Sequence, residues 1–245
     1  MKAIRQKQAD DSISCGACSL VNLCLGKGLD QGDLDKLDQI IDKKTQYDND
    51  EYLFHSGDGM RAVYAVRSGM VKTLITTESG AEQITGFHLP GELVGLDGFG
   101  KNEHLCDAMS LGTTTVCELK VESFDWVCEN IEGIRSQLLR MIGEELNHEQ
   151  GLLLALGQLK ADERLASLLL SLSERYKKRG FSALEFNLAM PRHDLANYLG
   201  LAPETLSRIF SKMHEEGILD VSGRDLRILD MPRMRKLAHC GKCCE

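Results

Sequence analysis

Residues 190–219, MPRHDLANYLGLAPETLSRIFSKMHEEGIL, constrain the fold more than any other part of this chain. Apolar residues recur at helical spacing on both sides of Gly200, and Pro203 is favoured as the first residue of a second helix. Gly217 is a plausible residue to end that helix. Its expected buried stripe consists of Leu206, Ile209, Phe210 and Met213. The segment therefore predicts a helix–turn–helix.

The opposite face of the second helix is polar and carries Glu204, Ser207 and Arg208 in its first turns. In DNA-binding helix–turn–helix proteins, this part of the second helix enters the major groove. Arginine can bind guanine, a carboxylate can accept from cytosine, and serine can do either. The following residues alternate around Ser222–Gly223, which predicts a hairpin wing. A plain helical hairpin with a solvated face is the alternative, and the wing favours DNA binding.

The charge distribution supports a nucleic-acid interface in the C-terminal third only. The whole chain has a net charge of −8, but residues 160–245 hold 15 Lys and Arg against 12 Asp and Glu. Residues 1–159 hold 14 against 25. A local positive balance is the electrostatic signature expected where DNA binds.

Residues 50–120 have a different pattern of short β-rich runs separated by glycines. Turn signals every eight to twelve residues predict a small antiparallel barrel or roll. Residues 30–45 precede it and predict a short amphipathic helix, with Leu34, Leu37, Ile40 and Ile41 on one face. The chain is therefore expected to have an α+β fold.

Residues 131–158 form the longest helical pattern, and its apolar positions follow a heptad repeat. The seam consists of Leu139, Ile142, Leu146, Glu149, Leu153 and Leu156. A helix packed on its own barrel is the alternative, but the narrow seam favours a two-helix dimer contact. Two Glu149 carboxylates about 4 Å apart would repel by roughly 4 kcal/mol at an effective dielectric constant near 20. The sequence thus predicts a marginal homodimer.

Three cysteines lie close together near the N-terminus, with Cys15, Cys18 and Cys24 in a Cys-x2-Cys-x5-Cys spacing. The first residues lack an apolar signal, and no run approaches the ~18 apolar residues of a membrane span. We expect a cytoplasmic protein whose thiols serve metal or redox chemistry rather than disulfides. The residues alone leave the fourth ligand open among Cys106, Cys117, Cys128 and the tail HCGKCCE.

The order of these parts resembles the CRP–FNR family of bacterial transcription regulators, and most of all its FNR-type oxygen sensors. The resemblance extends from about Cys15 to about Leu229 and rests on CGACSLVNLC, SGAEQITGFHLPGELVG, TTTVCEL and LGLAPETLSRIF. It implies an antiparallel β-roll of the cyclic-nucleotide-binding type, a long dimerisation helix and a C-terminal winged helix–turn–helix. The expected divisions are 1–29 for the cysteine segment, 30–128 for the roll, 129–159 for the dimerisation helix and 160–245 for the DNA-binding domain.

The resemblance also implies the ligands of a [4Fe–4S] cluster, which fall on Cys15, Cys18, Cys24 and Cys117. Oxygen would convert or remove such a cluster, and with it the support of the dimer helix. Cluster integrity would thereby control dimerisation and operator binding. Cys106 and Cys128 are then expected to be packing thiols.

Further implied contacts concern DNA and RNA polymerase. Glu204, Ser207 and Arg208 match the base-contacting residues of the family, which implies double-stranded DNA with TTGAT-like inverted half-sites. Pro203 stands at another contact position, where an aliphatic residue is common. The loop with Gly80, Ala81 and Glu82 resembles the surface that contacts RNA polymerase, although Ala81 replaces a frequent acidic residue. Such a protein activates or represses transcription and is not an enzyme.

Three alternatives remain at the sequence level. A cyclic-nucleotide regulator of the same family is disfavoured, because no arginine lies between Glu92 and Asp125 to bind a cyclic phosphate. A zinc- or thiol-based redox regulator is chemically allowed, since four thiolates also suit Zn²⁺. An iron–sulfur enzyme is disfavoured by the lack of a catalytic motif. The Cys240-x2-Cys243 spacing in the tail is left unassigned.

Overall fold

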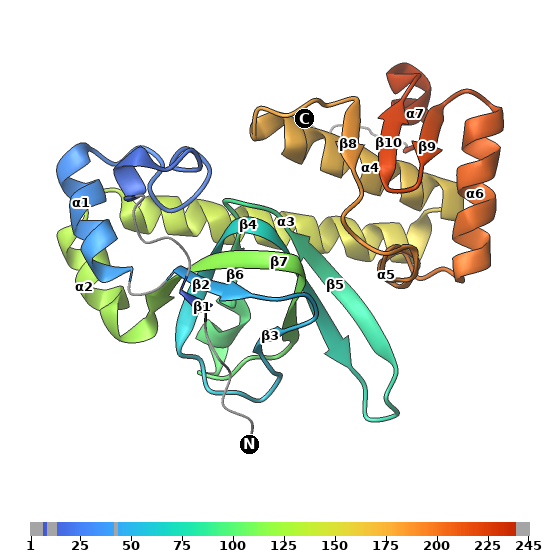
Figure 1. Cartoon of the computed structure of the whole chain (residues 1–245). Coiled ribbons are helices and arrows are strands. Elements are labelled where there is room, and N and C mark those ends of the chain that lie inside the picture. The colour runs from blue at the N-terminus through green and yellow to red at the C-terminus, as the bar shows by residue number, and fades with distance from the viewer. Residues whose placement is uncertain (1–6, 9–13, 42–43, 239–245) are drawn as a thin grey trace. The chain divides into compact units, whose positions relative to one another are not determined.

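The structure is a computed structural model that describes residues 7–8, 14–41 and 44–238 (Figure 1). The chain divides into two compact units, Met1–Asn147 and His148–Glu245. Helix α3 (Ile134–Gln158) begins in the first unit and ends in the second. Among the described residues, none of the helices is long and apolar enough to cross a membrane.

The first unit is built on a seven-stranded antiparallel sheet in the order β1-β2-β7-β4-β5, with β3 on β7 and β6 on β4. Two long strands, β4 (Ala62–Thr76) and β7 (Asp107–Lys120), form its centre. The others are β1 (Lys7–Gln8), β2 (Lys44–Tyr47), β3 (Tyr52–Phe54), β5 (Glu82–His88) and β6 (Leu93–Val94). Short 3₁₀ turns lie at Leu96–Gly100 and Val121–Ser123. This sheet confirms the predicted β-roll.

Helix α1 (Gln31–Ile40) follows the cysteine segment, which begins with a 3₁₀ turn at Cys15–Ala17. Asp30 caps α1 by accepting a hydrogen bond from the backbone N–H of Asp33. The helix is shorter than the predicted range 30–45, because Lys44–Tyr47 pairs with β7 as a strand. Leu34 and Leu37 are buried as predicted.

Helix α2 (Phe124–Asn130) leads into α3 through Gly133, whose φ of 83° lies in the left-handed region that favours glycine. One hydrophobic core joins the cysteine segment, the sheet and these helices. It includes Leu25, Leu37, Val63, Leu119, Val127, Ile134 and Met141, with Cys15 packed at its edge. Loss of order in the cysteine segment would therefore expose part of the same core that holds α3.

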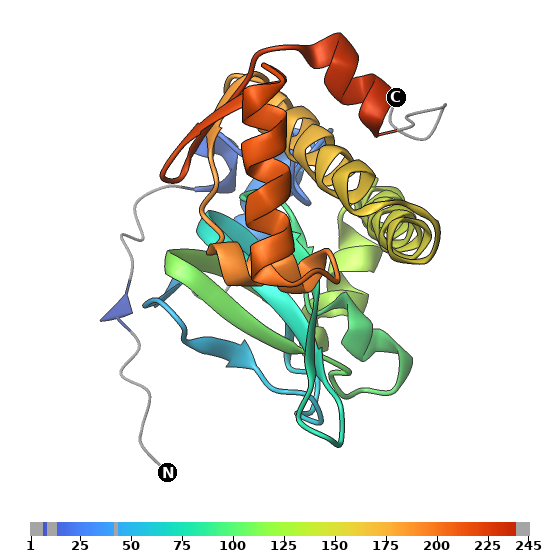
Figure 2. The same ribbon diagram turned by 90° about the vertical axis from the view of Figure 1, so that its right-hand side faces the viewer.

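The described part of the second unit contains helices α4, α5, α6 and α7 and a three-stranded sheet in the order β8-β10-β9, and its C-terminal elements are coloured orange to red in Figure 2. Helices α5 and α6 meet at Gly200, and α6 begins at Pro203 as predicted. The hairpin wing is also confirmed, whereas β8 and α7 were not predicted. The elements are α4 (Ala161–Lys178), β8 (Glu185–Asn187), α5 (Arg192–Tyr198), α6 (Pro203–Glu215), β9 (Leu219–Ser222), β10 (Asp225–Ile228) and α7 (Met231–Leu237).

Candidate functional site

Four cysteine thiols from two distant parts of the chain lie near one another in the first unit. Cys15, Cys18 and Cys24 belong to the N-terminal segment, and Cys117 lies on β7 opposite Ala65 of β4. All four are half-buried. The Cys15 thiol interacts electrostatically with those of Cys117 and Cys24, and the Cys24 thiol interacts with that of Cys18. The fold therefore connects the whole predicted ligand set pair by pair.

Burial disfavours the thiolate form of two of these thiols, Cys15 and Cys24. Burial raises the pKa of the Cys15 thiol far above its ordinary value, and the nearby Asp38 carboxylate raises it further. Burial also raises the pKa of Cys24. A cationic metal group would reverse this preference, because metal ions bind the thiolate form. The donor set therefore fits a thiolate-bound metal group, although among the described residues no three His, Cys, Asp or Glu side chains converge on one ion.

The loop that carries the thiols is held by short-range hydrogen bonds and by one close contact. The backbone N–H of Cys18 donates to the carbonyl of Cys15, at 3.2 Å, and that of Cys24 to the carbonyl of Leu20, at 3.1 Å. The backbone N–H of Cys15 donates to Asp38 Oδ1 on α1, at 2.8 Å. A Cβ added to Gly91 would lie 2.8 Å from Leu23 Cβ, so this turn of the roll must be glycine.

The other two described cysteines have different surroundings. Cys106 packs at the edge of the core inside the roll, and its thiol lies 3.5 Å from Asp97 Oδ2. Cys128 lies on α2 and packs against the core beneath α3. Both are half-buried, like the other four described cysteines, and their role as packing thiols stays a prediction. The remaining cysteines, Cys240, Cys243 and Cys244, lie outside the described residues.

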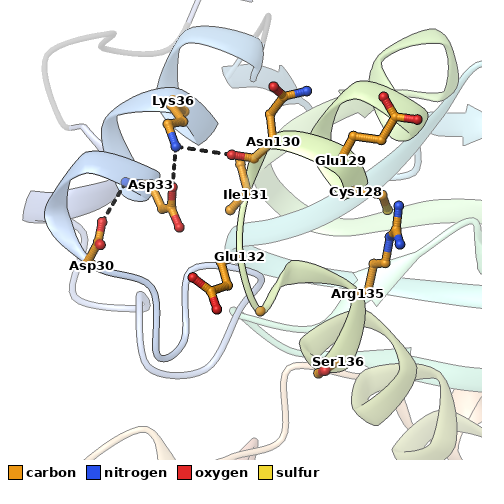
Figure 3. Close-up of a pocket in the computed structure, with 11 residues that line it drawn as sticks. Asp30, Asp33, Lys36, Cys128, Glu129, Asn130, Ile131, Glu132, Arg135 and Ser136 are labelled. Atoms are coloured by element: carbon orange, nitrogen blue, oxygen red, sulfur yellow. Dashed lines mark hydrogen bonds and ion pairs between the residues drawn. The ribbon is translucent and has the colours of Figure 1, made fainter.

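A polar pocket of about 610 Å³ lies between α1 and the junction of α2 with α3 (Figure 3). Lys36 bridges it by donating to Asp33 Oδ1 on its own helix, at 2.6 Å, and to the carbonyl of Asn130 at the end of α2, at 3.1 Å. The cation thus binds the C-terminal end of α2, where the helix dipole is negative. This contact ties α1 to the base of the long helix.

The predicted dimer seam of α3 is largely exposed in the single chain. Leu139 is 68% exposed, Leu146 53% and Leu153 70%. Ile142 and Glu149 are also exposed. Leu156, at the end of the seam, is half-buried and lies beside Gly200, where an added Cβ would be 3.2 Å from its Cδ2. Several exposed leucines on one helix face need a partner surface.

The polar face of α6 carries the predicted DNA-binding residues, all exposed. Pro203 and Glu204 begin the helix, and Ser207 and Arg208 follow one turn later. Ser207 Oγ donates to the carbonyl of Pro203, at 3.0 Å, while Arg208 Nε lies 3.4 Å from the carbonyl of Glu204. The opposite stripe of Leu206, Ile209, Phe210 and Met213 is buried as predicted. Helix α6 therefore packs with its apolar face and exposes its polar face.

Sequence reasoning missed Arg192, which connects the helix–turn–helix with its wing. Its guanidinium carbon lies 4.1 Å from the centre of the Phe210 ring on α6, and its Nη2 donates to the carbonyl of Gly223, at 3.2 Å. Its buried Nη1 has no hydrogen-bond partner among the described residues. Burial lowers the pKa of this side chain. No local pattern marked this arginine, because its partners lie far along the chain.

The residues predicted to contact RNA polymerase form the exposed tip of the β4–β5 hairpin. The backbone N–H of Gly80 donates to the carbonyl of Thr77, at 2.9 Å, and that of Ala81 to Thr77 Oγ1, at 3.1 Å. Gly80 has a φ of 81°, which suits its place in this turn. Glu82 begins β5 directly after the turn. The tip is thus an ordered, accessible loop.

Comparisons with known proteins identify a domain family in each of the two units. Residues 163–237 match the Crp-like helix-turn-helix domain, and residues 44–130 match the cyclic nucleotide-binding domain. The transcriptional activator protein anr of Pseudomonas aeruginosa is 44% identical over 224 residues, which cover 91% of this chain and 92% of that protein. The fumarate and nitrate reduction regulatory protein of Escherichia coli is 40% identical over 227 residues, 93% of this chain and 91% of that protein.

Solved structures show the same architecture. FixK2 from Bradyrhizobium japonicum superposes with a TM-score of 0.72 at 32% sequence identity, covering 78% of this chain and 94% of that one. A CRP-family transcriptional regulator from Thermus thermophilus, at 16% identity and a TM-score of 0.65, shows a likeness of fold alone.

Proposed function

The chain belongs to the CRP–FNR family of bacterial transcription regulators and is of its FNR type, and we propose that it senses oxygen through a [4Fe–4S] cluster bound by Cys15, Cys18, Cys24 and Cys117. It is a DNA-binding, homodimeric regulator of the FNR and Anr kind, and a relative from Haemophilus influenzae is named anaerobic regulatory protein. The observation that carries the sensing proposal is the set of four interacting, half-buried thiols.

Each thiol has a defined role in this proposal. Cys117 supplies a ligand from the rigid centre of the sheet, and the other three supply ligands from a loop that only turns and a few contacts hold. The cluster, when bound, supplies an oxygen-labile bond between the loop and the sheet. Cys15, Cys18, Cys24 and Cys117 would each supply one thiolate to such a multinuclear group, which does not require them to converge on one ion. The half-buried thiols leave the site accessible to a small molecule.

In this proposal, association through the dimer seam of α3 is the property that the cluster controls. Covering the exposed leucines of α3 favours association, whereas two Glu149 carboxylates across the seam oppose it by up to roughly 4 kcal/mol at 4 Å. The repulsion offsets part of the gain from covering the leucines, so the support of α3 affects the balance between monomer and dimer. A coupling of about 1–3 kcal/mol would then change dimer affinity about 5- to 150-fold.

A dimer presents two α6 helices to two half-sites of one operator. Glu204, Ser207 and Arg208 are proposed to contact the bases of TTGAT-like inverted half-sites, with Pro203 beside them. Bivalent binding multiplies the affinity of each helix, so loss of the dimer releases the operator. The hairpin tip with Gly80, Ala81 and Glu82 is proposed to contact RNA polymerase.

Cyclic-nucleotide sensing through the roll is not favoured, although the roll belongs to that domain family. Residues 92–125 contain no arginine for a cyclic phosphate. Phe54 and the buried His104 stack with their ring centres 3.6 Å apart inside the roll, and Glu92 accepts a hydrogen bond from the backbone N–H of Leu89, at 2.8 Å. The Phe54, His104 and Glu92 side chains thus contact other residues of the roll itself.

The test is purification without oxygen, followed by an oxygen titration with iron and sulfide analysis and sedimentation at each step. We expect the iron and sulfide of one [4Fe–4S] cluster per chain, with loss of visible absorbance as dimer becomes monomer. Cys117→Ser should abolish cluster binding, whereas Cys106→Ser, the same change at another half-buried cysteine, should preserve it. Bound zinc and a size that does not respond to oxygen would refute the proposal.

A further inference from the structure

Gln137 is a buried polar residue on α3 that contacts the thiol-bearing loop directly. Its side chain is only 7% exposed. Its Nε2 donates to the backbone carbonyl of Cys24, at 2.9 Å, and so joins residues 113 positions apart in the chain. The accepting peptide belongs to one of the proposed ligands. A buried amide needs such a partner, because leaving it unpaired is costly.

The oxygen of the same amide also has hydrogen-bond partners. Gln137 Oε1 accepts from Arg140 Nε, at 3.1 Å, and from Arg140 Nη2, at 3.0 Å. Arg140 Nη1 in turn pairs with Glu144 one turn further along α3. Since arginine can only donate, the oxygen of the amide must face Arg140 and its nitrogen must face Cys24. The orientation of Gln137 is therefore determined by its partners.

The position of Gln137 on α3 suits transmission from the loop to the dimer seam. Ile134 and Met141, about one turn to either side, are buried in the same core as Leu25, the residue after Cys24. The exposed seam leucines lie at the a and d positions of the heptad, and Gln137 lies at position f, on the other side of the helix. The helix thus touches the loop with one face and offers the other to a partner.

We propose that Gln137 is the positioning residue that couples the Cys24 loop to α3, so that the state of the thiol loop sets how α3 presents its dimer seam. This inference rests on the proposed function, because it requires the loop to respond to the cluster. The bond to the Cys24 peptide transmits a displacement of the loop to the helix. The two hydrogen bonds from Arg140 to Gln137 Oε1 keep the amide nitrogen facing the Cys24 carbonyl. Lys36 adds a second, more exposed tie between α1 and α2.

The test uses Gln137→Glu, which keeps the acceptor for Arg140 and removes the donor to the Cys24 carbonyl. Gln158→Glu is the matched control, because Gln158 is exposed, lies on the same helix and occupies the same heptad position three repeats later. Gln137→Met is a second variant that removes the donor without adding charge. Each full-length protein is prepared with and without the cluster.

In both Gln137 variants we expect normal iron content but a dimer dissociation constant at least about tenfold higher in the cluster-bound form. Cluster-free wild type and variants should dimerise alike. In the cluster-free proteins, hydrogen exchange should quicken at residues 21–29 and 134–141 in both Gln137 variants, and not in Gln158→Glu. Normal dimerisation of cluster-bound Gln137→Glu would overturn the coupling role, and so would reduced iron content, which would make Gln137 part of the binding site. A wild type without iron would instead refute the proposed function.

Discussion

Truncating Leu153 isolates the contribution of the α3 seam to dimerisation. Its side chain is 70% exposed in the single chain, so Leu153→Ala removes few contacts within that chain. The folding free energy of one chain should therefore change by less than about 0.5 kcal/mol. The same side chain is expected to be covered in the dimer, where the substitution removes contacts from both copies.

The size of the effect follows from the exposed fraction. Full burial of a leucine is worth about 1.5–3 kcal/mol, so covering the exposed part of Leu153 and then losing most of it costs roughly 1.5–3 kcal/mol per dimer. At 1.4 kcal/mol per tenfold, the dimer dissociation constant should rise roughly 10- to 100-fold. Incomplete collapse of the resulting cavity would add to this value.

The assay is sedimentation equilibrium of the cluster-bound protein over a range of concentrations, with urea unfolding of the single chain alongside. Leu154→Ala is the matched control, because Leu154 is the next residue, is 54% exposed and lies outside the a and d positions. It should leave dimerisation nearly unchanged. If Leu154→Ala weakens the dimer as much as Leu153→Ala does, the heptad seam is not the interface.

The other predictions concern the DNA-binding unit and the roll. Arg208→Ala should weaken operator binding about 5- to 150-fold, equivalent to 1–3 kcal/mol, and relax selectivity at one base pair, measured by titration against operators substituted at each position; an equal loss on unrelated DNA would contradict base contact. Arg192→Leu should lower the free energy of unfolding by about 1–2 kcal/mol, because the contacts with Phe210 and the carbonyl of Gly223 are lost, and unchanged urea unfolding would argue against that role. Burial raises the pKa of Tyr64 to about 12, so the native state disfavours the phenolate that forms near about pH 10 in the unfolded chain. The stability that neutral Tyr64 contributes should be present below about pH 10 and lost as the pH rises towards 12, and Tyr64→Phe should reduce this loss in urea unfolding at increasing pH.

Local patterns were sufficient for the helix–turn–helix. Pro203 begins α6, Gly200 occupies the turn with a φ of 61°, and Ser222–Gly223 marks the wing, as their conformational preferences predict. These features depend on backbone geometry within a few residues, which a sequence displays directly. The same holds for the heptad seam of α3. The end of α1 was placed too late, since the pairing of β2 with β7 competes with helix formation there.

Tertiary structure decided which side chains meet. From the residues alone the fourth thiol stayed open, and only the resemblance pointed to Cys117. In the fold, Cys117 interacts with Cys15, whereas Cys106 packs inside the roll and Cys128 on α2. Gln137 occupies a heptad position that is normally solvent-facing, so nothing in the sequence marks it as buried.

The sequence by itself therefore determined the helix–turn–helix with its wing, the apolar seam of α3 and the polar face of α6, because each follows from the spacing of neighbouring residues along a helix or strand. Only the fold shows the interaction of Cys117 with Cys15, the bond from Gln137 to the Cys24 peptide and the contacts of Arg192. Each of these joins parts of the chain that are far apart in sequence. Their meeting depends on how the strands, helices and core pack together, and that packing is a property of the whole chain.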